Sequence, residues 1–186
     1  MRIFAVLSAF GLLAACSSSS LLGDAFDSRV NSGACPPAGA VYLASRIVEL
    51  EGGDVLYNNI AYTGEIIDVR LFCRYAGTDP VRAEVEVDFA FGKGPRATSS
   101  SHTYRYWVAV TRRSGKVLSK EYFDVRADFG GDTVTGKSEL LQRIIIPRAD
   151  DSISAANFEV LVGFDLTDEQ LKFNKEGRRF RLGAGQ

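Results

Sequence analysis

The chain has 186 residues and a formal charge of −1, and 46% of its residues are hydrophobic. Its basic residues are scattered among acidic ones and form no run rich in Lys or Arg, so the composition predicts no nucleic-acid partner. The length predicts one domain of ordinary size with a hydrophobic core.

The first fifteen residues predict an export signal. Arg2 supplies a positive charge, and an apolar run follows over residues 3–13. This run is too short to span a bilayer, which takes roughly 20 residues. Small residues then precede Cys16 and predict cleavage between Ala15 and Cys16. An ordinary secretory signal that happens to contain a cysteine is the alternative.

The order Leu13-Ala14-Ala15-Cys16 resembles the lipobox of bacterial lipoproteins. The resemblance implies that the Cys16 thiol carries diacylglycerol and that its amino group is acylated after cleavage. Two or three buried acyl chains hold a protein firmly, whereas one chain gives only marginal binding. Ser17, and not an aspartate, follows the cysteine; by resemblance to the sorting rule of many Gram-negative lipoproteins, this implies the outer membrane. Loss of Arg2 with the signal moves the formal charge from −1 to −2.

Residues 16–34 predict a lipidated cysteine followed by a flexible tether. The segment is rich in serine and has no hydrophobic period. Eighteen flexible residues have a root-mean-square span of about 23 Å, enough to lift a domain clear of lipid headgroups. Residues 35–186 then form the predicted folded domain.

Cys35 and Cys73 remain as a pair once Cys16 is assigned to lipid. In an oxidising compartment such a pair predicts a disulfide, here between the start of the domain and an apolar strand. Closing a loop of roughly 39 residues stabilises a fold by about 4 kcal/mol. A two-cysteine metal site lacks partners, because the only histidine is His102. We therefore expect neither a metal nor a cofactor.

From Val41 onward the hydrophobic pattern has a period of two residues, which is typical of half-buried strands. The clearest run places Val81, Ala83, Val85, Val87, Phe89 and Phe91 on one face. An earlier run places Ile67, Val69, Leu71, Cys73 and Tyr75 on one face, and the residues at 77–80 predict a hairpin turn between the two runs. Further strands are expected at 42–50, 55–62, 103–112, 116–126, 138–146 and 157–165, with a second hairpin turning at Arg113-Ser114-Gly115.

Around eight short strands predict an all-β sandwich of immunoglobulin-like or transthyretin-like order, with a small closed barrel as the alternative. One short helix is expected near the C-terminus. Thr167 and Gln170 fit a capping box, and Gly177 is a suitable stop. The basic tail at 178–181 is a candidate last edge strand.

Arg105 and Trp107 form the candidate partner surface. In a strand they share one face, while Tyr104 and Tyr106 share the other. If the first face meets solvent, an Arg–Trp pair is typical of a surface that binds a partner. If that face is covered by the second sheet or by the helix, Trp107 belongs to the core.

Catalytic candidates are weak. His102 follows Ser99-Ser100-Ser101, but a nucleophile and base need a third orienting group and an oxyanion site, which a flexible Ser-rich loop does not hold. We therefore expect no enzymatic activity.

Several segments together resemble an uncharacterised family of proteobacterial lipoproteins with a β-sandwich-like domain. They are Cys35-Pro36, residues 61–69, Cys73-Arg74-Tyr75, residues 106–111, Ile146-Pro147, residues 160–164, residues 166–171 and Asn174. The resemblance implies a cell-envelope location and supports the Cys35–Cys73 disulfide. It brings no catalytic residues.

The sequence as a whole predicts a lipid-anchored, periplasm-facing envelope protein that acts as a non-enzymatic structural or docking module, with another envelope protein as its partner. The alternative is a carrier of a small apolar ligand, held in a cavity lined by Phe89, Phe91 and Phe164.

Overall fold

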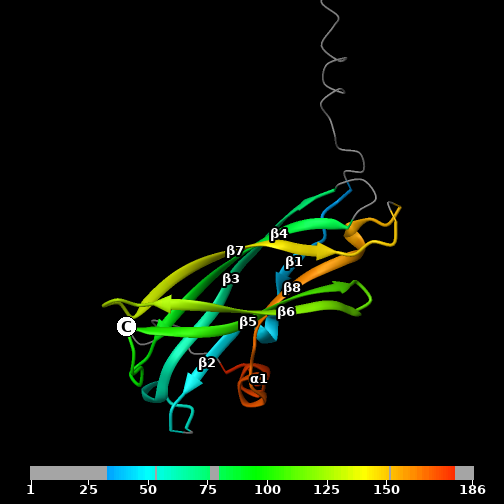
Figure 1. Cartoon of the computed structure of the whole chain (residues 1–186). Helices are drawn as coiled ribbons and strands as arrows, with labels where there is room; N and C mark the ends of the chain where they lie inside the picture. The colour runs from blue at the N-terminus through cyan, green and yellow to red at the C-terminus, as the bar shows by residue number, and fades with distance from the viewer. Residues whose placement is uncertain (1–32, 53, 76–79, 151, 179–186) are drawn as a thin grey trace, which may run out of the picture.

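A computed structural model describes residues 33–52, 54–75, 80–150 and 152–178 (Figure 1). Eight strands form two four-stranded sheets, which confirms the predicted all-β sandwich. Sheet A has the order β1 (Ala38–Ala40), β8 (Phe158–Phe164), β5 (Ser101–Arg112) and β6 (Val117–Asp128). Sheet B has the order β2 (Arg46–Leu50), β3 (Ile60–Arg74), β4 (Val81–Lys93) and β7 (Val134–Ile146).

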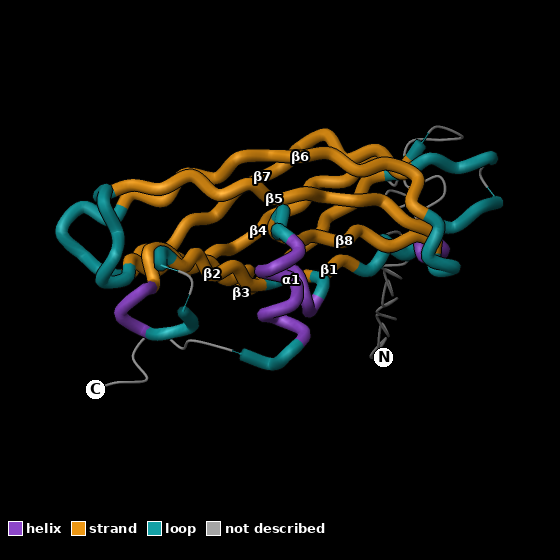
Figure 2. Tube along the Cα trace, turned by 90° about the horizontal axis from the view of Figure 1, so that it is seen from below, coloured by secondary structure: helices purple, strands orange, loops and turns teal. Residues whose placement is uncertain are grey.

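The chain combines antiparallel connections within a sheet with crossings between the sheets. The β3–β4 and β5–β6 pairs are antiparallel hairpins, as predicted, while the chain changes sheet between β4 and β5 and again between β6 and β7. Within sheet A, β1 runs parallel to β8. The two layers and the short helix α1 (Asp168–Lys175) are seen from below in Figure 2.

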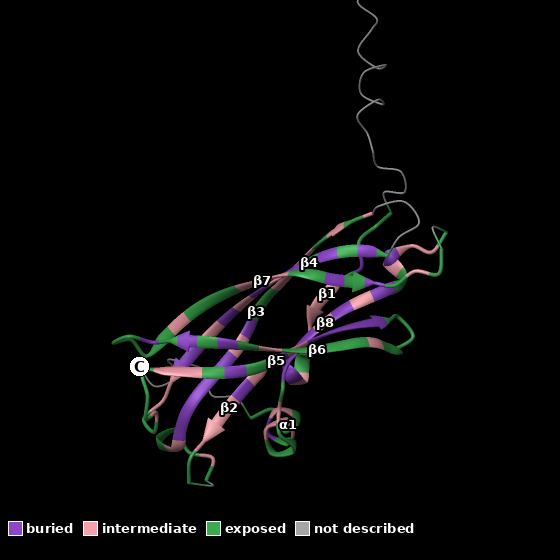
Figure 3. Cartoon of the chain, viewed as in Figure 1, coloured by how far each residue is buried: buried purple, intermediate pink, exposed green. Residues whose placement is uncertain are grey.

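Strand β4 shows why the two-residue period builds a sandwich. Its six apolar side chains from Val81 to Phe91 are all buried, whereas Arg82 and Glu84 between them are exposed (Figure 3). Successive strand residues point to opposite faces, so one face of β4 faces the other sheet and the second faces solvent.

Strand β3 differs from its prediction. The expected separate strands at 55–62 and 67–75 are one strand over Ile60–Arg74, and Tyr57–Asn59 forms a short 3-10 helix (η2). A bulge between Ile66 and Asp68 shifts the register, so Ile66 is 5% exposed and Ile67 is 59% exposed. The prediction that Ile67 shares the inner face was wrong, because an extra residue in one strand reverses the faces that follow it.

The N-terminal part of the domain also differs from its prediction. Strand β1 was missed, because three residues are too few to show a period. The strand expected at 42–50 is a 3-10 turn (η1, Tyr42–Ala44) followed by β2. A third 3-10 turn, η3 (Ala155–Asn157), precedes β8.

The predicted helix is confirmed at both of its ends. Thr167 and Gln170 make the reciprocal bonds of a capping box. At the other end Gly177 has a φ of 71°, and the N–H groups of Gly177 and Arg178 donate to the carbonyls of Asn174 and Phe173, the pattern of a Schellman motif. The rest of the predicted 178–181 strand lies outside the described residues.

Helix α1 covers the edge of sheet B beside β2. The amide of Asn174 donates to the carbonyls of Leu43 and Arg46, each at 2.8 Å. Phe173 is buried beneath the helix. A covered edge strand is protected from pairing with other chains.

Candidate partner surface

The two faces of β5 separate the four residues that sequence analysis singled out. Tyr104 and Tyr106 point into the core and are each 1% exposed. Arg105 and Trp107 lie on the outer face of sheet A, where the Arg105 side chain is 60% exposed. The predicted assignment of faces is therefore confirmed.

The neighbouring strand β6 completes the surface around Trp107. Tyr122 lies directly opposite Trp107 across the β5–β6 ladder. Lys120 places its Nζ 4.4 Å from the Trp107 ring centre and 5.0 Å from that of Tyr122. The Arg105 guanidinium carbon lies 4.7 Å from the Tyr122 ring centre. We call Arg105, Trp107, Lys120 and Tyr122 the aromatic face.

Cation–π contacts of this kind order long side chains that would otherwise move freely in solvent. The same guanidinium also lies near a carboxylate, because its Nε is 3.6 Å from an Asp165 oxygen. Tyr122 remains 45% exposed beside these cations. The aromatic face thus presents to solvent an ordered patch of rings and two cations, with the carboxylates of Asp124 and Asp165 beside them.

Trp107 is only partly exposed, so it lies between the two predicted alternatives, a solvent-exposed partner surface and a core position. Its Nε1 donates to the Phe164 carbonyl at 3.1 Å, and the ring lies over Gly163 of β8, next to Ala44. A Cβ at position 163 would come within 2.6 Å of the indole. Glycine therefore makes room for the indole, which is half-buried against β8 and η1.

The core beneath this face is aromatic. The ring of Tyr104 stacks on Phe91 with centres 4.5 Å apart, and Tyr106 meets Phe89 edge-on at 5.1 Å. The Tyr104 hydroxyl donates to the Thr63 carbonyl of sheet B at 2.9 Å and so joins the two sheets. Burial raises the pKa of both tyrosines above its usual value, with smaller contributions from the charges of Glu49 and Glu139 respectively.

Lys120 and Tyr122 were missed by sequence analysis, because the turn alone does not fix their register. Pairing outward from the turn at Arg113-Ser114-Gly115 would place Glu121 opposite Trp107, whereas a register shift between Val110 and Thr111 places Tyr122 there. Gly115 has a φ of 86°, which confirms the turn. The hairpin was predicted, but the irregularity within it was not.

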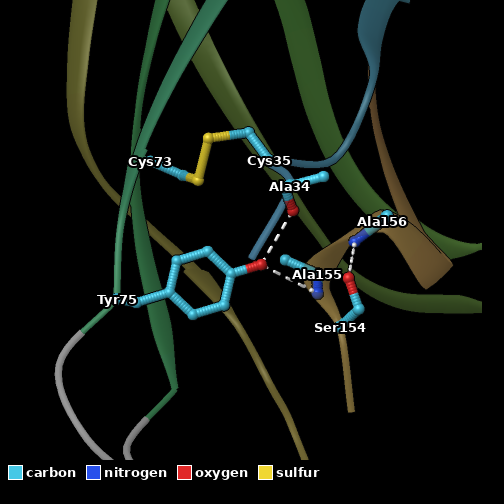
Figure 4. The surroundings of a disulfide bond; sticks show 7 residues. All are labelled: Ala34, Cys35, Cys73, Tyr75, Ser154, Ala155 and Ala156. Carbon is cyan, nitrogen blue, oxygen red and sulfur yellow. Dashed lines mark hydrogen bonds between the residues drawn. A yellow bond between two sulfur atoms is a disulfide. The ribbon is translucent and has the colours of Figure 1, made fainter. Parts of the chain in front are cut away.

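The disulfide predicted between Cys35 and Cys73 is present, with Cα atoms 5.6 Å apart (Figure 4). Beside it, the Tyr75 hydroxyl donates to the Ala34 carbonyl at 2.7 Å and accepts the Ala155 N–H at 3.1 Å. The start of the described chain is therefore fixed both to β3 and to the turn before β8.

The predicted lipidation at Cys16 and cleavage between Ala15 and Cys16 lie outside the described residues, as do residues 1–32 in general. Within the described part of the chain, no helix is long and apolar enough to cross a membrane.

His102 lies in β5, so its predicted place in a flexible loop was wrong. Its Nε2 lies 3.0 Å from a Glu49 carboxylate oxygen, and its ring stacks on Tyr62 at 4.1 Å. The structure thus gives His102 a carboxylate partner rather than a serine. Among the residues that the structure describes, no group of three or more His, Cys, Asp or Glu side chains is arranged to hold a metal ion.

Comparisons with protein-family models, with curated proteins and with solved structures found no match for this chain.

Proposed function

We propose that this chain is a lipid-anchored envelope protein whose sandwich domain docks another envelope protein through the aromatic face. The observation that carries the proposal is the exposed arrangement of Arg105, Trp107, Lys120 and Tyr122 across two strands. Tyrosine, tryptophan and arginine are the residues most enriched among those that dominate binding energy at protein interfaces.

The anchor part of the proposal rests on Leu13-Ala14-Ala15-Cys16 and on the serine-rich segment behind it. The Cys35–Cys73 disulfide supports it, because disulfides persist in oxidising compartments such as the periplasm. Ser17 after the cysteine favours sorting to the outer membrane, and in this proposal the domain faces the periplasm.

The structure of the face suits docking. Lys120 and Arg105 are held by rings and keep most of their N–H donors for a partner, and Trp107 is already fixed by its bond to the Phe164 carbonyl. Side chains ordered before binding lose less conformational entropy when a partner arrives. A partner that offers carboxylates beside an apolar side chain fits this patch.

The packing of the core favours docking over the carrier alternative. Phe89, Phe91 and Phe164 were expected to line a ligand cavity. Phe89 instead stacks on Phe91 with ring centres 5.6 Å apart and contacts Phe164 at 5.9 Å, and all three are buried. These rings pack against one another and against the two inner tyrosines, so they do not line the predicted cavity.

The test combines intact mass with site-directed crosslinking in whole cells. The membrane-extracted protein is expected to begin at a lipidated Cys16. A photo-crosslinking amino acid at Asp124, which lies opposite Arg105 on the same face, is expected to capture one specific envelope protein. The same amino acid at the exposed Tyr57 is the matched control. Capture at both positions alike, or at neither, would overturn the docking surface, and an unlipidated chain would overturn the anchor.

A further inference from the structure

Positive side chains gather at the end of the sandwich where the described chain begins. Arg74 ends β3 and Arg82 is the second residue of β4. Arg112 ends β5, Arg113 and Lys116 lie in the turn before β6, and Arg143 lies near the end of β7. We call these six residues the basic end. They lie far apart in the sequence, and only the fold brings them together.

Pairings along the strands place these segments at one end. Arg112 lies opposite Phe158, the first residue of β8. Ala155, just before β8, donates its N–H to the hydroxyl of Tyr75, the residue after β3. The Tyr75 hydroxyl in turn donates to the Ala34 carbonyl, so the described chain begins at this same end (Figures 1 and 4).

The cations of the basic end form no ion pairs within the described residues, and all six are exposed. Arg112 has a cation–π contact instead, with its guanidinium carbon 5.5 Å from the Phe158 ring centre. By contrast Arg70, farther along β3, lies within 3.1 Å of three carboxylates, which belong to Asp68, Glu86 and Asp88.

Carboxylates do not balance the charge at this end. The described ones are Glu84, Asp150, Glu159 and Glu121, which lines a groove together with Arg143. Asp79 and Asp151 adjoin this end in the sequence and lie outside the described residues; with them six carboxylates face seven cations, which are the six of the basic end and Arg148.

Arg74 and Arg82 lie directly opposite each other on the outer face of sheet B. Like charges in this position repel and destabilise a sheet, unless a negative surface outside the chain compensates them. Apolar side chains flank the pair on the same face: Ile145 lies opposite Arg82, and Phe72 is two residues before Arg74. Both are more than half exposed.

We propose that the basic end docks onto the surface of an anionic phospholipid bilayer. Lys and Arg side chains are attracted to anionic headgroups, while neighbouring apolar side chains enter the interface. The inference rests on the proposed anchor at Cys16. Residues 17–32 number sixteen and span about 22 Å when flexible, so the anchor would hold this end, and not the opposite one, near the lipid. Tethering also makes a weak docking contact intramolecular and thereby raises its occupancy.

Native lysines provide the test. The mature lipidated protein is placed in vesicles of phosphatidylcholine with phosphatidylglycerol, or of phosphatidylcholine alone, and its lysines are labelled with an amine-reactive reagent. Lys116 is expected to be protected in the anionic vesicles only, while Lys175 on α1 reacts equally in both. Raising the salt from 0.1 to 1 M shortens the screening length from about 10 to about 3 Å and is expected to remove the protection without releasing the anchor.

A double variant, R74Q with R82Q, is expected to weaken docking about 30-fold, because each basic residue near an anionic surface contributes about a fivefold gain in affinity. The matched control is R96Q with K175Q, which removes the same charge at positions away from this end. Because this variant lacks Lys175, Lys93 serves there as the lysine expected to react equally in both vesicles. Protection of Lys116 that is equal in both vesicles, or that survives R74Q with R82Q, would overturn the inference alone. A chain that floats with neither vesicle would overturn the anchor and the inference together.

Discussion

The inner and outer faces of β5 use aromatic side chains in different ways. On the inner face Tyr104 and Tyr106 are sealed between the sheets by rings from β4. On the outer face Trp107 leans on β8 while Tyr122 lies beside two cations in solvent. A ring alone therefore does not distinguish core from binding surface. The groups that cover the ring do, and on the outer face Tyr122 is covered only by the side chains of Arg105 and Lys120 and by solvent.

The prediction with the largest expected effect compares substitutions of two adjacent residues, one on each face. Tyr104→Ala is expected to lower the free energy of unfolding by about 3–5 kcal/mol, since it empties a ring-sized volume and removes the bond to the Thr63 carbonyl. Arg105→Ala is expected to change it by no more than about 0.5 kcal/mol, because its side chain is exposed. Urea unfolding measures both, and comparable losses would contradict the assignment of the two faces.

Alkaline pH should lower the stability of the fold through the two buried tyrosines of the inner face. Burial raises the pKa of Tyr104 and Tyr106 in the folded state, so the unfolded chain loses these protons first as pH rises above about 10. Stability is therefore complete below that pH and falls above it, by about 1.4 kcal/mol per pH unit for each tyrosine. In Tyr106→Phe, urea unfolding as a function of pH should show a shallower fall. An unchanged slope would show that Tyr106 does not contribute to the pH dependence of stability.

A smaller effect is expected where the outer face meets β8. Gly163→Ala places a methyl group within 2.6 Å of the Trp107 indole and is expected to cost about 1–3 kcal/mol while moving the indole toward solvent. Trp107 is the only tryptophan, so a red shift of its fluorescence reports the movement. Gly39→Ala, on the adjacent strand β1, is the control, because a Cβ there meets nothing within 4 Å. Unshifted emission in Gly163→Ala would refute the close contact.

Much of this contrast was predictable from alternation. The period of two assigned Tyr104 and Tyr106 to one face and Arg105 and Trp107 to the other, and it defined β4. It failed at Ile66-Ile67, because two adjacent isoleucines satisfy either face and only the pairing with β4 decides between them. The disulfide followed from the parity of the cysteines, which does not depend on geometry.

Features that combine distant segments were not predictable in the same way. The basic end looks like scattered charge in the sequence, because its members come from positions 74 to 143. Likewise, no local sequence pattern predicts that Gly163 makes room for Trp107, because the contact depends on β8 lying beside β5. Tertiary contacts of this kind need the strand order, and periodicity does not provide it.

The smallest expected change in stability is paired with a large change in binding. Lys120→Gln with Tyr122→Ala should alter the free energy of unfolding by no more than about 0.5 kcal/mol, because both side chains lie on the exposed face of β6. Capture of the partner from position 124 should nevertheless fall about 30-fold, since a ring and a cation at the centre of an interface each contribute about 1 kcal/mol. Tyr57→Ala removes a more exposed tyrosine outside the aromatic face and should leave capture unchanged. If the double variant unfolds early, these side chains serve the fold. If it is stable and still captures the partner, docking takes place elsewhere, and the contrast between the two faces of β5 is one of burial alone.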